Sequence, residues 1–123
     1  MYIVEAVTCA QSISDQVRPE IPGSWINAGG AGIGWSNGVA LGAKLGWDTI
    51  RDSAGKNLKN VCHIVGDGSY MCSSPASAAW VAAKYKVPIL TVMVNNGGKS
   101  FLLCIYFPSF LLSHIKAIYP ILW

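Results

Sequence analysis

Two short apolar runs, at residues 61–65 and 89–94, limit the possible folds of this chain more than any other part of its sequence. Both are rich in valine and isoleucine and are bounded by turn-forming residues, a pattern typical of strands buried on both faces. Between them, Ser74 and Pro75 match the cap and first residue of a helix, which we expect to cover residues 76–85 and end before Pro88. Two strands joined by a helix predict a parallel pair with a right-handed crossover.

The preceding part of the chain predicts further elements of the same kind. We expect strands at residues 2–7 and 24–28, helices at residues 11–17 and 35–47, and connections at residues 18–23 and 48–60. The connections contain proline or glycine, which interrupt regular structure. Alternating strands and helices predict an α/β fold in which helices flank a parallel sheet.

Composition excludes several classes of protein. A chain of 123 residues is long enough for one small domain. Its 52% of hydrophobic and 12% of charged residues exclude intrinsic disorder, and a net charge of +3 without a basic run argues against nucleic-acid binding. A chain with so little charge is expected either to bury part of its surface against a partner or to be part of a larger assembly. The first five residues lack the basic start of a signal peptide, so we expect an intracellular location, cytoplasmic rather than mitochondrial.

Eight of the 13 glycines fall within residues 23–46 and follow two spacings. Gly29, Gly30 and Gly32 would allow unusual backbone angles and the close approach of a ligand. A second set recurs every four residues and would let another backbone approach one face of the expected helix: Gly34, Gly38, Gly42 and Gly46. The dinucleotide-binding pattern G-x-G-x-x-G is absent, because Asn37 stands where its third glycine is needed. Two alternatives explain this glycine block at residues 23–46: a ligand-binding loop, or a tight turn before a closely packed helix.

Polar motifs follow both apolar runs directly. The sequence Gly-Asp-Gly-Ser, with Asp67, follows the first run, and Asn-Asn-Gly-Gly, with Asn96, follows the second. In an open parallel sheet both motifs lie at the carboxyl ends of strands, where such sheets bind ligands. The side-chain oxygens of Asp67 and Asn96 suit Mg²⁺ or Ca²⁺, and the N–H groups of Gly68 and Ser69 suit a phosphate. The alternative is that each motif is only a turn.

Taken together, these motifs resemble those of the thiamine-diphosphate-dependent 2-keto-acid enzymes, the group of acetolactate synthase, benzoylformate decarboxylase and pyruvate decarboxylase. The resemblance is carried by the paired Asp67 and Asn96 motifs, by Glu-Ala-Val-Thr at residues 5–8 and by residues 28–46. It covers about residues 2–98 and concerns the C-terminal cofactor-binding domain of these enzymes. It therefore implies an incomplete thiamine-diphosphate-binding domain over residues 1–98.

The resemblance implies a metal and diphosphate site. In the family pattern, the side chains of Asp67 and Asn96 and the main-chain carbonyl of Gly98 bind Mg²⁺, which bridges the diphosphate of the cofactor. Gly68 and Ser69 donate main-chain N–H groups to that diphosphate.

For the remainder of the cofactor, the resemblance implies three contacts. Thr8 is a further candidate for cofactor binding. The carbonyl of Ala31 accepts a hydrogen bond from the aminopyrimidine, and the side chain of Ile33 supports the cofactor in its bent form. The glycine block and the Asp67 motif would thus serve opposite ends of one ligand.

The resemblance also implies the activity of the intact enzyme, a 2-keto-acid decarboxylase or carboligase, hence a lyase or transferase acting on a small 2-keto acid. Such an enzyme is a homo-oligomer, a dimer or tetramer, with its site at the subunit interface. A glutamate on a separate N-terminal domain activates the cofactor there, and neither Glu5 nor Glu20 matches it. We therefore assign no catalytic residue and expect these 123 residues to be inactive alone. A non-catalytic module that binds Mg²⁺ and diphosphate is the alternative.

Residues 99–123 depart from the family pattern. They are apolar, and a small membrane-associated protein built on them is a further alternative. A spanning helix needs about 20 apolar residues, however, and Pro108, His114, Lys116 and Pro120 interrupt the stretch. We interpret it as an atypical tail outside the family fold, the end of a truncated or mis-spliced gene product, and expect no membrane partner.

Overall fold

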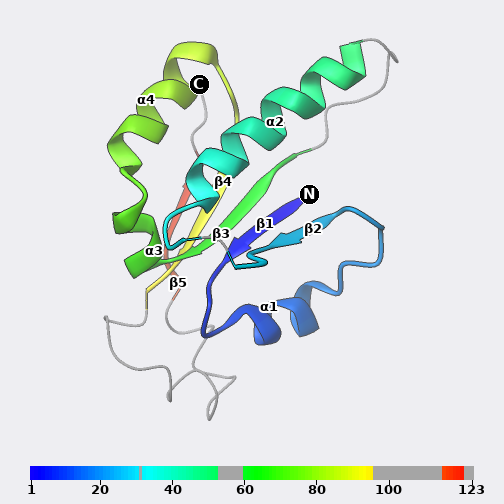
Figure 1. Ribbon diagram of the computed structural model, residues 1–123, viewed down its shortest axis with the longest axis vertical. Coiled ribbons are helices and arrows are strands. Elements are labelled where there is room, and N and C mark those ends of the chain that lie inside the picture. The colour runs from blue at the N-terminus through cyan, green and yellow to red at the C-terminus, as the bar shows by residue number, and fades with distance from the viewer. Residues whose placement is uncertain (31, 53–59, 96–114, 121–123) are drawn as a thin grey trace.

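The computed structural model describes residues 1–30, 32–52, 60–95 and 115–120, and within them the chain forms a five-stranded sheet of order β2-β1-β3-β4-β5. Four strands run parallel to one another: β1 (Tyr2–Glu5), β2 (Trp25–Asn27), β3 (Cys62–Gly66) and β4 (Leu90–Val94) (Figure 1). Strand β5 (Ile115–Pro120) pairs antiparallel with β4 at one edge. The predicted α/β fold with a parallel sheet is confirmed.

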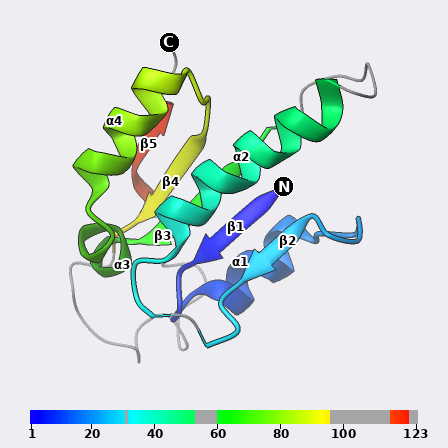
Figure 2. The ribbon, with the colours of Figure 1, turned by 45° about the horizontal axis from the view of Figure 1, so that its top comes forward.

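Helices cover both faces of this sheet. Helices α2 (Ser36–Asp52) and α4 (Pro75–Tyr85) lie on one face, and α1 (Ala10–Val17) lies on the other (Figure 2). A short helix, α3 (Asp67–Cys72), follows β3 directly. None of the helices within the described residues is long and apolar enough to cross a membrane.

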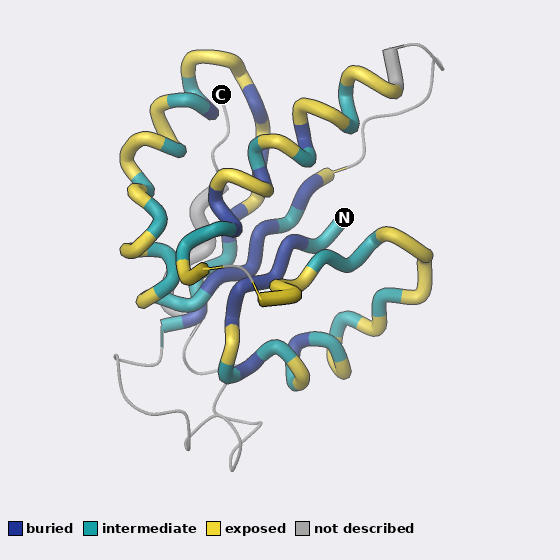
Figure 3. Tube along the Cα trace, viewed as in Figure 1, coloured by how far each residue is buried: buried dark blue, intermediate teal, exposed yellow. Residues whose placement is uncertain are grey.

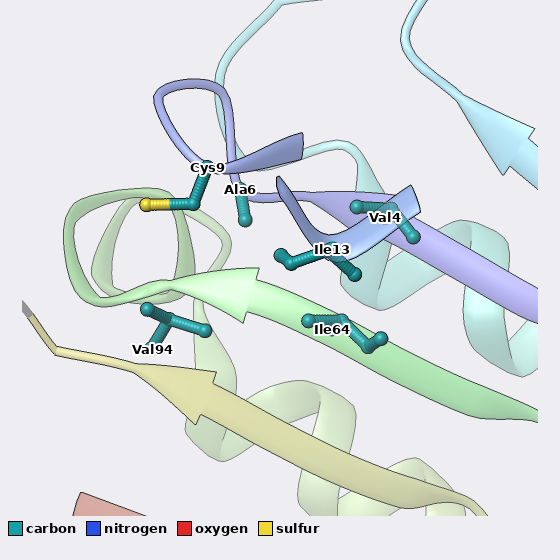
Figure 4. Close-up of a cluster of buried hydrophobic side chains, with 6 residues drawn as sticks. All are labelled: Val4, Ala6, Cys9, Ile13, Ile64 and Val94. Atoms are coloured by element: carbon teal, nitrogen blue, oxygen red, sulfur yellow. The ribbon is translucent and has the colours of Figure 1, made fainter. Parts of the chain in front are cut away.

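Each face of the sheet has its own hydrophobic core, because successive residues of a strand point to opposite faces. Val4 belongs to the core beneath α1, with five other buried residues: Ala6, Cys9, Ile13, Ile64 and Val94 (Figure 4). Its neighbour Ile3 belongs to the core on the α2 side, with Ala40, Val61, Val87 and Ile89. This two-sided burial explains why most residues of β1, β3 and β4 are apolar on both faces of the sheet.

The register of the sheet brings the carboxyl ends of three strands to one edge. Glu5 at the end of β1 pairs with Val65 of β3, and Gly66 at the end of β3 pairs with Val94 at the end of β4. The segments that follow β1, β3 and β4 therefore begin side by side, which is the arrangement that the sequence predicts for a ligand site.

The structure differs from the sequence-based expectation at two helices. Helix α2 continues to Asp52, whereas residues 48–52 were expected to belong to a connection. An ion pair of 2.8 Å between the buried Lys44 and Asp48 and a bond from the Thr49 hydroxyl to the Leu45 carbonyl hold the additional turn. Helix α3 was not predicted, because its six residues are too few to show a hydrophobic period.

The glycine stripe packs closely at one position within the described residues. A Cβ atom at Gly34 would lie 3.0 Å from the backbone of Cys72 and Ser73, and the φ angle of Gly34 is +94°. At Gly38, Gly42 and Gly46 nothing lies within 4 Å of such an atom, and all three are exposed. Exposed positions recur along α2 (Figure 3). The expected approach of another backbone along this helix face is therefore wrong for the part of the chain that the structure describes, except at Gly34.

Candidate functional site

A pocket of about 160 Å³ opens where β1 and β3 end, and we call it the strand-end pocket. Two segments far apart in the sequence line it, residues 5–9 and residues 66–69, together with Val94. They meet because β1 and β3 are adjacent parallel strands that end at the same edge. The pocket thus brings together four of the predicted cofactor or metal residues: Thr8, Asp67, Gly68 and Ser69.

The remaining predicted residues are not among the described residues that line this pocket. Ala31, Asn96 and Gly98 are outside the described residues. Ile33 is described, but it does not line the strand-end pocket: it lies in the turn before α2 and is 71% exposed.

The pocket wall at residues 66–69 combines a carboxylate with main-chain donors. Asp67 is the first residue of α3, and Gly66 precedes it in extended conformation. The first N–H groups of a helix have no partner within the helix, so Gly68 and Ser69 have donors to offer. The Asp67 carboxylate accepts hydrogen bonds only and would repel a bare diphosphate. A divalent cation between the two removes this conflict, and the oxygen ligands present here fit Mg²⁺.

A second carboxylate, that of Glu5, lines the pocket but has a different role. Glu5 is only 2% exposed. Its Oε1 accepts a hydrogen bond of 2.5 Å from the N–H of Gly34, and its Oε2 accepts one of 2.9 Å from the N–H of Ser36. Negative charge is favourable at this point because Ser36 begins α2. Sequence reasoning missed this role, although an acidic residue that ends an apolar strand was a signal for it.

The side chain of His63 is part of a buried polar network. His63 is 1% exposed, its Nε2 lies 2.8 Å from the hydroxyl of Ser36, and its Nδ1 lies 3.4 Å from the hydroxyl of Thr91. Burial lowers the pKa of His63 to about 4, and the nearby Glu5 offsets only part of this effect. His63 is therefore neutral near pH 7, and its side chain joins β3 to β4 and α2.

This lowered pKa predicts that stability falls with acidity. The ordinary pKa of histidine is 6.5, whereas that of folded His63 is about 4, so the unfolded chain binds more protons between these values. The contribution of neutral His63 is complete above pH 6.5 and is lost as the pH falls towards 4. We expect the free energy of unfolding to decrease over this range by at most about 3 kcal/mol. Urea unfolding from pH 7 to 4 should show a shallower decrease for His63→Gln, and parallel curves would contradict the prediction.

A second cavity, of about 220 Å³, lies between α2, α4 and the sheet. Its walls are mainly apolar, with alanines such as Ala40, Ala78 and Ala82 facing the buried His63. It contains none of the predicted cofactor residues. The strand-end pocket is therefore where four of the five described site residues that the sequence predicts lie together.

A parallel α/β sheet with a polar pocket at its strand ends defines a class of ligand-binding domains. Comparison with known proteins identifies the family. Residues 6–102 match the model of the thiamine pyrophosphate enzyme C-terminal TPP binding domain, and the chain belongs to this family. The sequence resemblance is thereby confirmed.

One curated relative is benzoylformate decarboxylase from Pseudomonas aeruginosa, which is 27% identical over 97 residues. That alignment covers 79% of this chain but 16% of the relative, so the chain spans about a sixth of the length of that enzyme. No solved structure matches the chain significantly. The described fold and the family match together show a thiamine-diphosphate-binding domain of the kind found at the C-terminus of decarboxylase-like enzymes.

Proposed function

We propose that the chain binds thiamine diphosphate through Mg²⁺ at the strand-end pocket, as the cofactor-binding part of a 2-keto-acid decarboxylase or carboligase. The observation that carries the proposal is the meeting of Thr8, Asp67 and Ser69 in one pocket, in a chain that matches the family over residues 6–102. A polar site at the carboxyl ends of parallel strands is where α/β domains hold phosphorylated ligands.

Asp67 would bind the metal, with the side chain of Asn96 and the carbonyl of Gly98 as further ligands. The carboxylate of Asp67 lines the pocket and supplies a hard oxygen ligand. The main-chain N–H groups of Gly68 and Ser69 would hold the diphosphate, and the hydroxyl of Thr8 would hydrogen-bond to it from the facing wall. Metal and donors together would neutralise the charge of the diphosphate.

The other end of the cofactor would lie toward the turn that precedes α2. We propose that Ile33 supports the bent cofactor and that the carbonyl of Ala31 accepts a bond from its aminopyrimidine. The exposed side chain of Ile33 is available for such a contact. When bound, thiamine diphosphate supplies the carbanion chemistry, and this chain supplies binding and orientation.

The activity of the whole protein follows as a proposal. The relative is named a decarboxylase, which supports a lyase or an acetolactate-synthase-like transferase acting on a 2-keto acid, assembled as a homo-oligomer. No residue of this chain matches the activating glutamate, so we propose that residues 1–123 bind the cofactor without turnover. We also propose that residues 1–98 form the partial domain and residues 99–123 an atypical tail, of which residues 115–120 add an edge strand to the sheet.

Thermal unfolding with the two ligands tests the proposal. A ligand that binds only the folded state, at a free concentration of about 100 times its Kd, raises the free energy of unfolding by about 2.7 kcal/mol. We expect a clear increase in Tm with Mg²⁺ and thiamine diphosphate together, and little change with either alone or with Mg²⁺ and thiamine, which lacks the diphosphate. A folded chain whose Tm does not respond to the pair would overturn the proposal.

A further inference from the structure

The buried carboxylate of Glu5 has a place in the strand-end pocket that the proposed ligand contacts do not use. Glu5 ends β1, lines the pocket and is 2% exposed. A buried carboxylate close to a diphosphate site is unfavourable unless its charge is compensated. Here both oxygens accept main-chain N–H bonds, from Gly34 at 2.5 Å and from Ser36 at 2.9 Å. The turn before α2 thus compensates the charge of Glu5.

This arrangement also gives the first N–H group of α2 a negatively charged acceptor. That helix has 17 residues, and its N-terminus would otherwise attract an anion. Glu5 accepts the N–H of Ser36 there, and neither Gly34 nor Ser36 is among the described residues that line the strand-end pocket, so a diphosphate in that pocket would bind the donors of Gly68 and Ser69 instead.

The turn that Glu5 holds is fixed from a second side as well. Gly34 has a φ of +94°, and a Cβ atom there would lie 3.0 Å from the backbone of Cys72 and Ser73. Cys72 is the last residue of α3, and Asp67 is the first. The turn at Gly34 is thus held between the end of β1 and the end of the helix that carries Asp67. Ile33, next to Gly34, is placed relative to the pocket by these contacts.

We propose that Glu5 is a positioning residue that sets the distance between the two ends of the cofactor site. By binding the N–H groups of Gly34 and Ser36, it fixes the turn that carries Ile33 relative to the pocket wall that carries Asp67. It does not touch the cofactor, and its effect passes through the turn. This inference rests on the proposed function, because it concerns how that same site recognises the part of the ligand beyond the diphosphate.

Two ligands separate this role from a general structural one. Inorganic diphosphate with Mg²⁺ uses only the strand-end pocket, whereas thiamine diphosphate with Mg²⁺ also needs the turn. Glu5→Gln replaces one acceptor oxygen by a donor that faces a main-chain N–H, so one of the two bonds is lost. By calorimetric titration of the full chain, we expect the variant to bind thiamine diphosphate about tenfold or more weakly and inorganic diphosphate with nearly wild-type affinity. Glu20→Gln, in the exposed loop before β2, is the matched control and should change neither affinity.

Each outcome decides the inference. Equal weakening of both ligands in Glu5→Gln, or no change for either, would overturn the positioning role while leaving the proposed function intact. Failure of the wild-type chain to bind either ligand would overturn the proposed function, and the positioning role with it. If Glu5→Gln does not fold, Glu5→Asp keeps the charge but shortens the side chain by one methylene group, so the carboxylate cannot hold the N–H groups of both Gly34 and Ser36 at their present distances. The same selective loss of thiamine diphosphate affinity is then expected.

Discussion

Gly34→Ala is expected to lower the free energy of unfolding by about 2–4 kcal/mol. Two costs combine at this position. The φ of +94° is one that residues with a Cβ atom rarely adopt, and the added Cβ would lie 3.0 Å from backbone atoms of Cys72 and Ser73. Backbone atoms cannot move aside as the end of a flexible side chain can, so the turn or the end of α3 has to shift. Urea unfolding followed by circular dichroism measures the loss.

Gly38→Ala is the matched control for this prediction. Gly38 lies within α2, and nothing is within 4 Å of the Cβ atom that the substitution adds. Alanine in a helix interior is more favourable than glycine by roughly 0.5–1 kcal/mol, so this variant should be slightly more stable than wild type. Opposite signs for the two substitutions are expected, and equal effects would contradict the described geometry of the turn.

Asp67→Ala is expected to abolish the joint stabilisation by Mg²⁺ and thiamine diphosphate. Among the described residues, Asp67 is the only proposed metal ligand. Its side chain is a carboxylate, and the residue lies in the wall of the strand-end pocket. Without its carboxylate the proposed metal would lose its only charged protein ligand, and the diphosphate would lose the cation that it shares with the protein. The Tm of the variant should therefore be the same with and without the two ligands, whereas the wild-type value rises.

Asp15→Ala controls for the loss of a carboxylate elsewhere. Asp15 is exposed on α1, where its Oδ1 accepts a bond of 2.9 Å from Gln11. This substitution should leave the response to the ligands unchanged. If Asp67→Ala keeps the full shift in Tm, or if Asp15→Ala loses it, Asp67 does not hold the metal.

Local sequence patterns were sufficient for the elements that build the sheet. The valine- and isoleucine-rich runs predicted β3 and β4 to within one residue at each end, and Ser74 with Pro75 predicted the start of α4. The same patterns placed the Asp67 motif at the end of a strand. The family resemblance supplied Thr8, which no spacing rule connects with Asp67. The prediction succeeded here because hydrophobic period, capping and turn chemistry act over a few residues and depend little on the remainder of the chain.

The structure corrected the expectations that depended on distant contacts. The four-residue glycine spacing includes Gly34, in the turn before α2, and Gly38, within α2. Of these two, only Gly34 packs closely, because the backbone at the end of α3 lies next to it. Helix α3 itself carries no periodic signal. Glu5 was excluded as the activating glutamate, and its actual partners lie 29 and 31 residues away.

The sequence by itself therefore determined the class of the fold, the place of the Asp67 motif at a strand end and the family. Only the tertiary structure decided the partners of two buried polar side chains: Glu5 accepts the first N–H of α2, and His63 is bonded to Ser36 and Thr91. It also decided that residues 5–9 and 66–69 line one pocket. The physical reason is that buried polar groups must find hydrogen-bond partners. Strand register and helix placement select those partners, and neither is encoded in the local sequence pattern.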